Sequence, residues 1–120
     1  MNACGINRGT AGNVSARCGD GFIVTPTGMD YAKSLAVDMV FMRIDGTTDG
    51  VRKPSSEWRF HRDIYAARPE IGAVVHTHSL FATSLACLGM EIPPFHYMIA
   101  RFGGEEMEKV LALFRSYGQQ

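Results

Sequence analysis

Two histidines separated by one residue, at the end of an apolar run, constrain the fold more than any other feature of the chain. Residues 73–79 read AVVHTHS, so His76 and His78 follow an alanine and two valines. Because valine is β-branched, this segment is predicted to be the end of a buried strand. Side chains at positions i and i+2 of a strand lie on the same side, which places the two Cα atoms ~6.6 Å apart.

Two imidazoles at that separation can bind one cation, with ~2.1 Å between the ion and each nitrogen. Zinc is the usual occupant of such a pair. The pair is also compatible with two histidines that only form hydrogen bonds at a strand end. Both interpretations stay open when the pair is considered alone.

Composition argues against two classes of partner. The chain has 120 residues, of which 46% are apolar and 20% charged, as in an ordinary soluble domain. Lys+Arg and Asp+Glu balance at 12 each, so bulk charge attracts neither nucleic acid nor an anionic membrane. The longest apolar stretch, residues 80–88, is too short to span a bilayer. We therefore expect no nucleic-acid partner and no membrane partner.

The first residues and the cysteines favour a cytoplasmic location. Residues 1–5 (MNACG) show neither the basic nor the apolar region of an export signal. Cys4, Cys18 and Cys87 are odd in number and lack CxxC spacing. Reduced thiols in a cytosol are therefore expected rather than a disulfide framework.

The order of apolar patterns and turn signals predicts an α/β fold with a mixed β-sheet flanked by helices. Strands are expected at residues 14–17 and 22–25, which form a hairpin, and at 39–44 and 74–78. A helix is predicted to open at residues 54–57 (PSSE) with a serine N-cap and to close at Pro69. Further helices are predicted at residues 79–88 and 105–117, the latter with an apolar stripe of Met107, Val110, Leu111 and Phe114.

Three short polar segments have groups that suit a phosphate: residues 12–15 (GNVS), 25–28 (TPTG) and 54–56 (PSS). They offer hydroxyls, a side-chain amide and backbone N–H groups, and the last segment lies at a helix N-terminus. Each segment is also an ordinary turn or cap. The phosphate interpretation therefore depends on a fold that brings the three together.

Glu57 follows the two serines and has two interpretations. In the first turn of a helix, a glutamate commonly offsets the helix dipole. Beside a cation, it could instead be a general base that removes a proton next to a carbonyl group. His61, one turn later, could support such a site, but a packed or solvent-facing residue is the more ordinary role. His96 is structural by default.

Five segments occur in one order along the chain: GTAGNVSAR (9–17), TPTGM (25–29), KPSSEWRFH (53–61), VVHTHS (74–79) and IPPFHYMIA (92–100). Together they resemble the class II aldolase/adducin family, most of all its L-fuculose-phosphate aldolase branch. The resemblance covers residues 9–104.

The resemblance implies a lyase that cleaves a ketose 1-phosphate, such as L-fuculose 1-phosphate, into dihydroxyacetone phosphate and an aldehyde through a zinc-stabilised enediolate. It implies Zn²⁺, or another divalent metal, as cofactor and a small phosphorylated sugar as substrate. The implied metal ligands are His76, His78 and Glu57, with Glu57 also the acid/base, while Tyr97 helps to protonate the aldehyde side. The implied phosphate-binding residues are Asn13, Thr27, Gly28, Ser55 and Ser56.

Other branches of the family stay open. A glutamate followed by Trp58 favours aldolases over pentulose-phosphate 4-epimerases, which have an aspartate-containing segment here, without excluding dehydratases or decarboxylases of sugar-acid phosphates. A catalytically silent, adducin-like module that binds a sugar phosphate or a protein is an alternative of a different class. Such a module has no reason to keep Glu57, His76 and His78 together, which favours the lyase.

The chain departs from the family pattern at both ends. Residues 1–120 would be the N-terminal half of a single domain, with residues 105–120 as an atypical C-terminal helix. The family takes a third metal histidine from a later strand, so weaker metal binding and poor or no turnover are expected. An uncovered sheet edge, and the tetramers typical of the family, favour a homo-oligomer.

Overall fold

The computed structural model describes residues 1, 3 and 5–91. Residues 1–80 and 81–120 form two compact units, and each is described by itself. The predicted helix over residues 105–117 and the predicted roles of Tyr97 and His96 lie outside the described residues.

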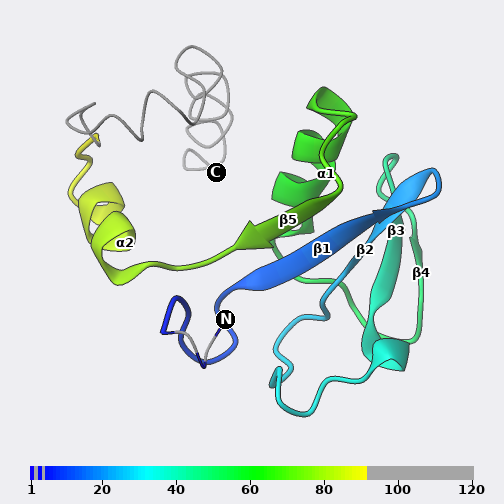
Figure 1. Cartoon of the computed structure of the whole chain (residues 1–120), viewed down its shortest axis with the longest axis horizontal. Coiled ribbons are helices and arrows are strands. Elements are labelled where there is room, and N and C mark those ends of the chain that lie inside the picture. Colours follow the sequence, from blue (N-terminus) through cyan, green and yellow to red (C-terminus); the bar gives the residue numbers. More distant parts are fainter. Residues whose placement is uncertain (2, 4, 92–120) are drawn as a thin grey trace. The chain divides into compact units, whose positions relative to one another are not determined.

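Within the described residues, five strands form one sheet in the order β4-β3-β2-β1-β5 (Figure 1). Every pairing among them is antiparallel, so any parallel pairing of the predicted mixed sheet would involve other residues. A short 3-10 helix, η1 (Ala36–Asp38), precedes the third strand. The strands are β1 (Asn13–Cys18), β2 (Gly21–Val24), β3 (Val40–Arg43), β4 (Thr48–Asp49) and β5 (Ala73–His76).

The predicted hairpin and third strand are confirmed, with bounds within one residue of those expected. β1 and β2 pair from Ser15 opposite Val24 to Cys18 opposite Gly21, and the turn lies between them. Gly19 in this turn has a φ of +55°, which a residue without Cβ adopts at little steric cost. β3 continues the sheet by pairing with β2.

One face of the sheet packs against helix α1 (Trp58–Ala67), beside which β5 also lies (Figure 1). On the inner face of this helix His61 and Tyr65 are buried, and Trp58 packs against the core. The Tyr65 ring lies 5.2 Å from the Phe22 ring between centroids. The fully packed apolar residues are Phe22, Val24, Val40, Met42 and Tyr65.

Arg17 of β1 fastens the C-terminal end of α1 to the sheet. Its guanidinium donates to the backbone carbonyls of Tyr65, Arg68 and Ile71 at 3.0, 3.1 and 3.0 Å. Carbonyls at a helix C-terminus lack partners within the helix, so Arg17 satisfies groups that would otherwise need water. The helix ends at its C-cap Arg68, directly before Pro69, as predicted.

The predicted serine N-cap of α1 is wrong. The N-cap is Glu57, whose side chain makes no capping hydrogen bond. Ser55 lies two residues earlier, and its hydroxyl accepts a hydrogen bond from the Glu57 N–H at 3.2 Å. The Ser55 N–H donates to the Thr25 carbonyl at 3.0 Å. This pairing with the neighbouring loop holds Ser55 outside the helix, and Ser56 and Glu57 form the turn that leads into α1.

The strand predicted at residues 74–78 is present as β5, but its predicted burial is wrong. Within the described residues, β5 is an edge strand that pairs with β1 alone, and Val75 is 57% exposed. Since α1 covers one face of the sheet, only alternate side chains such as Val74 reach the core. β5 ends at His76, so His78 lies in the connection that follows.

The second unit begins within helix α2 (Leu80–Cys87), which confirms the helix predicted at residues 79–88. Gly89 follows with a φ of +65°, the left-handed conformation common at helix C-termini. Cys18 and Cys87 are free thiols, as expected. None of the helices in the described part of the chain is long and apolar enough to cross a membrane.

Gly12, just before β1, provides a test of the β1–β5 pairing. A Cβ at this position would lie 2.6 Å from the backbone oxygen of His76, so Gly12→Ala must displace one of the two strands. We expect the free energy of unfolding to fall by about 1–3 kcal/mol. Gly72→Ala is the matched control, because its Cβ would meet nothing within 4 Å. Equal denaturant midpoints for the two variants would contradict the observed packing.

Candidate metal centre

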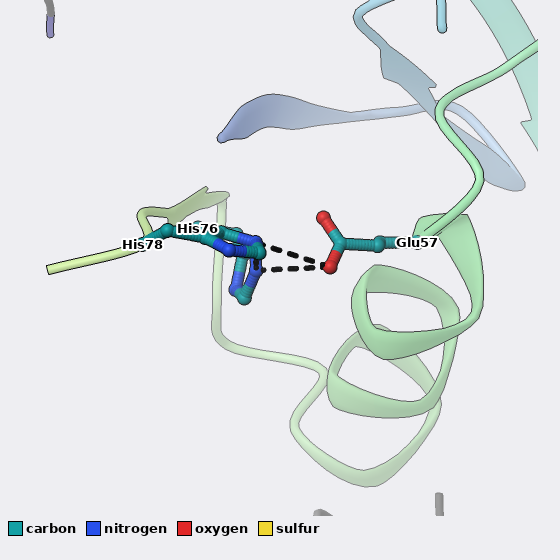
Figure 2. A group of neighbouring side chains, drawn as sticks. All are labelled: Glu57, His76 and His78. Atoms are coloured by element: carbon teal, nitrogen blue, oxygen red, sulfur yellow. Dashed lines mark hydrogen bonds and ion pairs between the residues drawn. The ribbon is translucent and has the colours of Figure 1, made fainter. Parts of the chain in front are cut away.

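The carboxylate of Glu57 and the imidazoles of His76 and His78 converge on one point. Glu57 Oε1 lies 3.3 Å from Nε2 of each histidine, and the two Nε2 atoms are 3.0 Å apart. Figure 2 shows the carboxylate, at the start of α1, pointing toward both rings. The structure therefore brings together the three residues predicted as metal ligands.

These separations fit a tetrahedral divalent ion. Ligand atoms ~2.0–2.1 Å from a tetrahedral centre lie ~3.3–3.4 Å from one another. The three observed separations are 3.0, 3.3 and 3.3 Å. Two imidazole nitrogens and one carboxylate oxygen also form a common donor set of catalytic zinc sites, in which a further position stays open. The residues present therefore fit a bound zinc ion.

Two parts of the fold place these side chains. Pairing of β1 with β5 sets His76 directly opposite Asn13, and the Phe60 ring of α1 stacks against His76 at 5.7 Å between centroids. His78 lies beyond the end of β5, yet its ring shares a side with that of His76, as strand alternation predicts. Glu57 is fixed by its position at the first turn of α1.

Asn13 is buried and connects the centre to the interior. Its Nδ2 donates to Glu57 Oε2 at 2.7 Å, and its Oδ1 is hydrogen-bonded to Nε2 of His61. The amide nitrogen carries two hydrogens, so one of them is not committed to Glu57. The predicted contact of Asn13 with a phosphate would have to use that hydrogen or the backbone.

The two other segments predicted to bind phosphate lie side by side. The Thr27 N–H donates to the Lys53 carbonyl at 3.1 Å, and Pro26 and Pro54 form an antiparallel bridge. Thr27, Gly28 and Ser56 are exposed, whereas Ser55 is buried and bonded to the Glu57 backbone. The fold thus supplies the proximity on which the phosphate interpretation depended, and it separates Ser55 from the exposed donors.

Tyr97, the predicted acid on the aldehyde side, lies outside the described residues. Tyr31, which sequence reasoning did not single out, is close enough to Glu57 to interact with its charge, and its side chain is hydrogen-bonded to Thr25. Partial burial raises the pKa of Tyr31, and the negative charge of Glu57 acts in the same direction. The position of Tyr31 in the sequence gives no indication that it lies near Glu57.

His61 is fully buried with both ring nitrogens hydrogen-bonded, which excludes the solvent-facing role considered for it. Nδ1 is 2.6 Å from the Ser15 hydroxyl, and Nε2 contacts Asn13. Burial lowers the pKa of His61 from 6.5 to about 4; the positive charge of a protonated His76 lowers it too, while Glu57 opposes the shift. His61 is therefore neutral at physiological pH.

This burial predicts a loss of stability in acid. As the pH falls from 6.5 towards 4, the unfolded chain binds a proton at His61 before the folded chain does. The free energy of unfolding should fall through this window by up to about 1.4 kcal/mol per pH unit from this group. When the free energy of unfolding, measured by urea denaturation, is plotted against pH, the slope for His61→Gln should be smaller than that for wild type by the equivalent of nearly one proton. Parallel curves for the variant and wild type would contradict a buried neutral imidazole.

Comparison with known proteins shows to which family and which relatives this chain is similar. Residues 1–117 match the family described as Class II Aldolase and Adducin N-terminal domain. The 5-methylthioribulose-1-phosphate/5-deoxyribulose-1-phosphate aldolase of Rhodospirillum rubrum is 57% identical over 107 residues, which are 89% of this chain and 48% of that protein. The L-fuculose phosphate aldolase of Escherichia coli strain K12 is 46% identical over 107 residues, 89% of this chain and 50% of that protein.

Solved structures share the fold. An L-fuculose 1-phosphate aldolase matches with a TM-score of 0.75 and 40% identity, over 82% of this chain and 48% of that one. The L-fuculose-1-phosphate aldolase of Thermus thermophilus matches with a TM-score of 0.59 and 32% identity, over 70% and 43%. The predicted α/β fold class is confirmed, and the chain spans about half the length of the curated relatives it matches.

Proposed function

Because the chain belongs to the class II aldolase and adducin family, we propose that it supplies the metal ligands and the base of an aldehyde-lyase. The reaction is the cleavage of a ketose 1-phosphate to dihydroxyacetone phosphate and an aldehyde. The relatives named above are aldolases of phosphorylated sugars, which supports this reaction type. A cytoplasmic location and a homo-oligomer are part of the same proposal. The exposed apolar side chain of Val75 on the edge strand supports the homo-oligomer.

One observation carries the proposal: Glu57 Oε1 meets Nε2 of His76 and of His78 at tetrahedral spacing. A bound divalent ion, zinc by its donor set, would supply Lewis acidity to the oxygens beside the bond that breaks. A silent adducin-like module needs no such convergence of ligands. The geometry therefore favours the lyase over that alternative.

The chain's own residues would divide the work. Glu57 moves a proton at the carbon next to the substrate carbonyl, which requires a carboxylate within reach of that carbon. Thr27, Gly28 and Ser56 offer exposed donors to the phosphate, with Asn13 and Ser55 behind them. When the phosphate is held, the reacting carbon is fixed beside the base, so the free energy of phosphate binding serves to orient the substrate. Tyr97 would serve the aldehyde side.

The names of the relatives narrow the substrate class. 5-Methylthioribulose, 5-deoxyribulose and fuculose phosphates share a ketose phosphate end and differ at the far end of the sugar. The identity to the Rhodospirillum rubrum protein is 57%, against 46% to the Escherichia coli L-fuculose enzyme. We therefore place 5-substituted or 5-deoxy pentulose 1-phosphates beside L-fuculose 1-phosphate as substrates, with the common product dihydroxyacetone phosphate.

Metal content tests the ligand assignment. Protein reconstituted with zinc and freed of excess should hold about one ion per chain, as measured by elemental analysis. His76→Ala should bind zinc at least about 100-fold more weakly, because one of three ligands is removed. His61→Gln is a control in the same region that leaves all three ligands in place. A wild-type protein without zinc after reconstitution would overturn the proposal.

Proton exchange tests the base. In deuterated water, the zinc-loaded protein should exchange a hydrogen on the hydroxymethyl carbon of dihydroxyacetone phosphate, followed by NMR. Glu57→Gln should slow this exchange by about 10²–10⁴-fold at saturating zinc. The matched control is Glu70→Gln, which changes an exposed glutamate paired with Arg68. An unchanged exchange rate in Glu57→Gln would remove Glu57 from the mechanism.

A further inference from the structure

A line of buried side chains runs inward from the metal centre. It starts at Glu57 Oε2, which accepts from Asn13 Nδ2 at 2.7 Å, and passes through Asn13 Oδ1 to Nε2 of His61. On the other side of the ring, Nδ1 lies 2.6 Å from the Ser15 hydroxyl, which lies 2.8 Å from the Tyr65 hydroxyl. Asn13, Ser15, His61 and Tyr65 are each at most 3% exposed.

The carboxylate and an uncharged His61 ring together fix the direction of every hydrogen bond in this line. An ionised carboxylate only accepts, so Asn13 must present its N–H₂ to Glu57 and its carbonyl oxygen to His61. His61 must then donate from Nε2. Its Nδ1 becomes an acceptor for the Ser15 O–H, and Ser15 in turn accepts from the Tyr65 O–H. Reversing any member would set two acceptors or two donors against each other.

The direction of the last two hydrogen bonds depends on an uncharged ring. An imidazolium would donate from both nitrogens, and Ser15 would then have to turn its hydrogen toward the Tyr65 hydroxyl. Burial, which lowers the pKa of His61 to about 4, agrees with the neutral form. Tyr65 is in turn held by its packing against Phe22 and by the Arg17 guanidinium, 4.7 Å above its ring centroid.

We infer that His61 is a positioning residue of the metal centre: neutral and protonated at Nε2, it locks the Asn13 amide so that Glu57 is held by Oε2 and presents Oε1 to the two histidines. This inference rests on the proposed function only in giving Glu57 a catalytic role. Without a donor at position 61, the Asn13 amide is free to turn its oxygen toward the carboxylate. The carboxylate would then lose its anchor and the fixed direction of Oε1.

The tautomer of His61 is the first test. Full-length protein labelled with ¹⁵N in histidine should give a two-bond ¹H–¹⁵N spectrum at pH 7 with one histidine in the neutral Nε2–H form. That signal should be absent from His61→Gln. A signal for His61 in the Nδ1–H form, or as the imidazolium, would overturn the inference. This measurement needs neither metal nor substrate.

Zinc affinity is the second test, with a rescue variant. His61→Phe keeps a ring but cannot donate to Asn13, and we expect about 10–100-fold weaker zinc binding. His61→Gln keeps an N–H group near the position of Nε2 and should stay within about threefold of wild type. Tyr65→Phe removes only the far end of the line and should also stay within about threefold. A role in folding alone would not separate the glutamine from the phenylalanine variant.

The outcomes separate the inference from the proposed function. If wild type and His61→Phe bind zinc equally, the inference fails while the metal assignment stands. If wild type binds no zinc, the proposed function fails, and the tautomer alone decides the inference. If His61→Phe does not fold, as judged by near-UV circular dichroism, the tautomer of His61 in the wild type decides the inference.

Discussion

The polar face that β1 turns toward α1 is the constraint on which the rest of the structure depends. Alternate residues Asn13, Ser15 and Arg17 share this face, and each bonds to α1 or to the loop after it. Such groups cost free energy when buried without partners, so each bond both fixes the helix and removes a penalty. The interface between sheet and helix is therefore specified by direction and not only by apolar contact.

β1 also positions the other part of the candidate metal centre, which lies at the end of β5. On its second edge β1 pairs with β5, in a register that sets Asn13 opposite His76. Asn13 therefore positions both groups: its side chain is hydrogen-bonded to the Glu57 carboxylate, and its backbone lies opposite His76 in the sheet. Catalytic geometry tolerates little displacement. Because both groups are positioned by the same residue, a displacement of Glu57 relative to His76 is limited.

Sequence reasoning predicted four of the five described strands and both described α-helices, and it grouped Glu57, His76 and His78, since these depend on local periodicity and on motif order. It did not predict β4 or η1. Sequence reasoning failed where burial or hydrogen bonding depends on segments that are distant in the sequence. Val74 and Val75 look like a buried strand, but their exposure depends on which faces other elements cover. Ser55 looks like a helix cap, but it is held by Thr25 in a distant segment. His61 could not be placed because its partners, Asn13 and Ser15, are more than forty positions away.

A neutral chain of hydrogen bonds is a suitable support for a base beside a metal. A charged donor, such as a guanidinium or an imidazolium, would hold the carboxylate more strongly, but it would also favour the carboxylate over its protonated form. A bound metal would act in that direction too. An amide held by a neutral imidazole orients the carboxylate without adding positive charge, so Glu57 would keep its affinity for the proton that the proposed reaction requires it to take up. Burial of His61 keeps the ring neutral, and for this reason the support has to lie inside the protein.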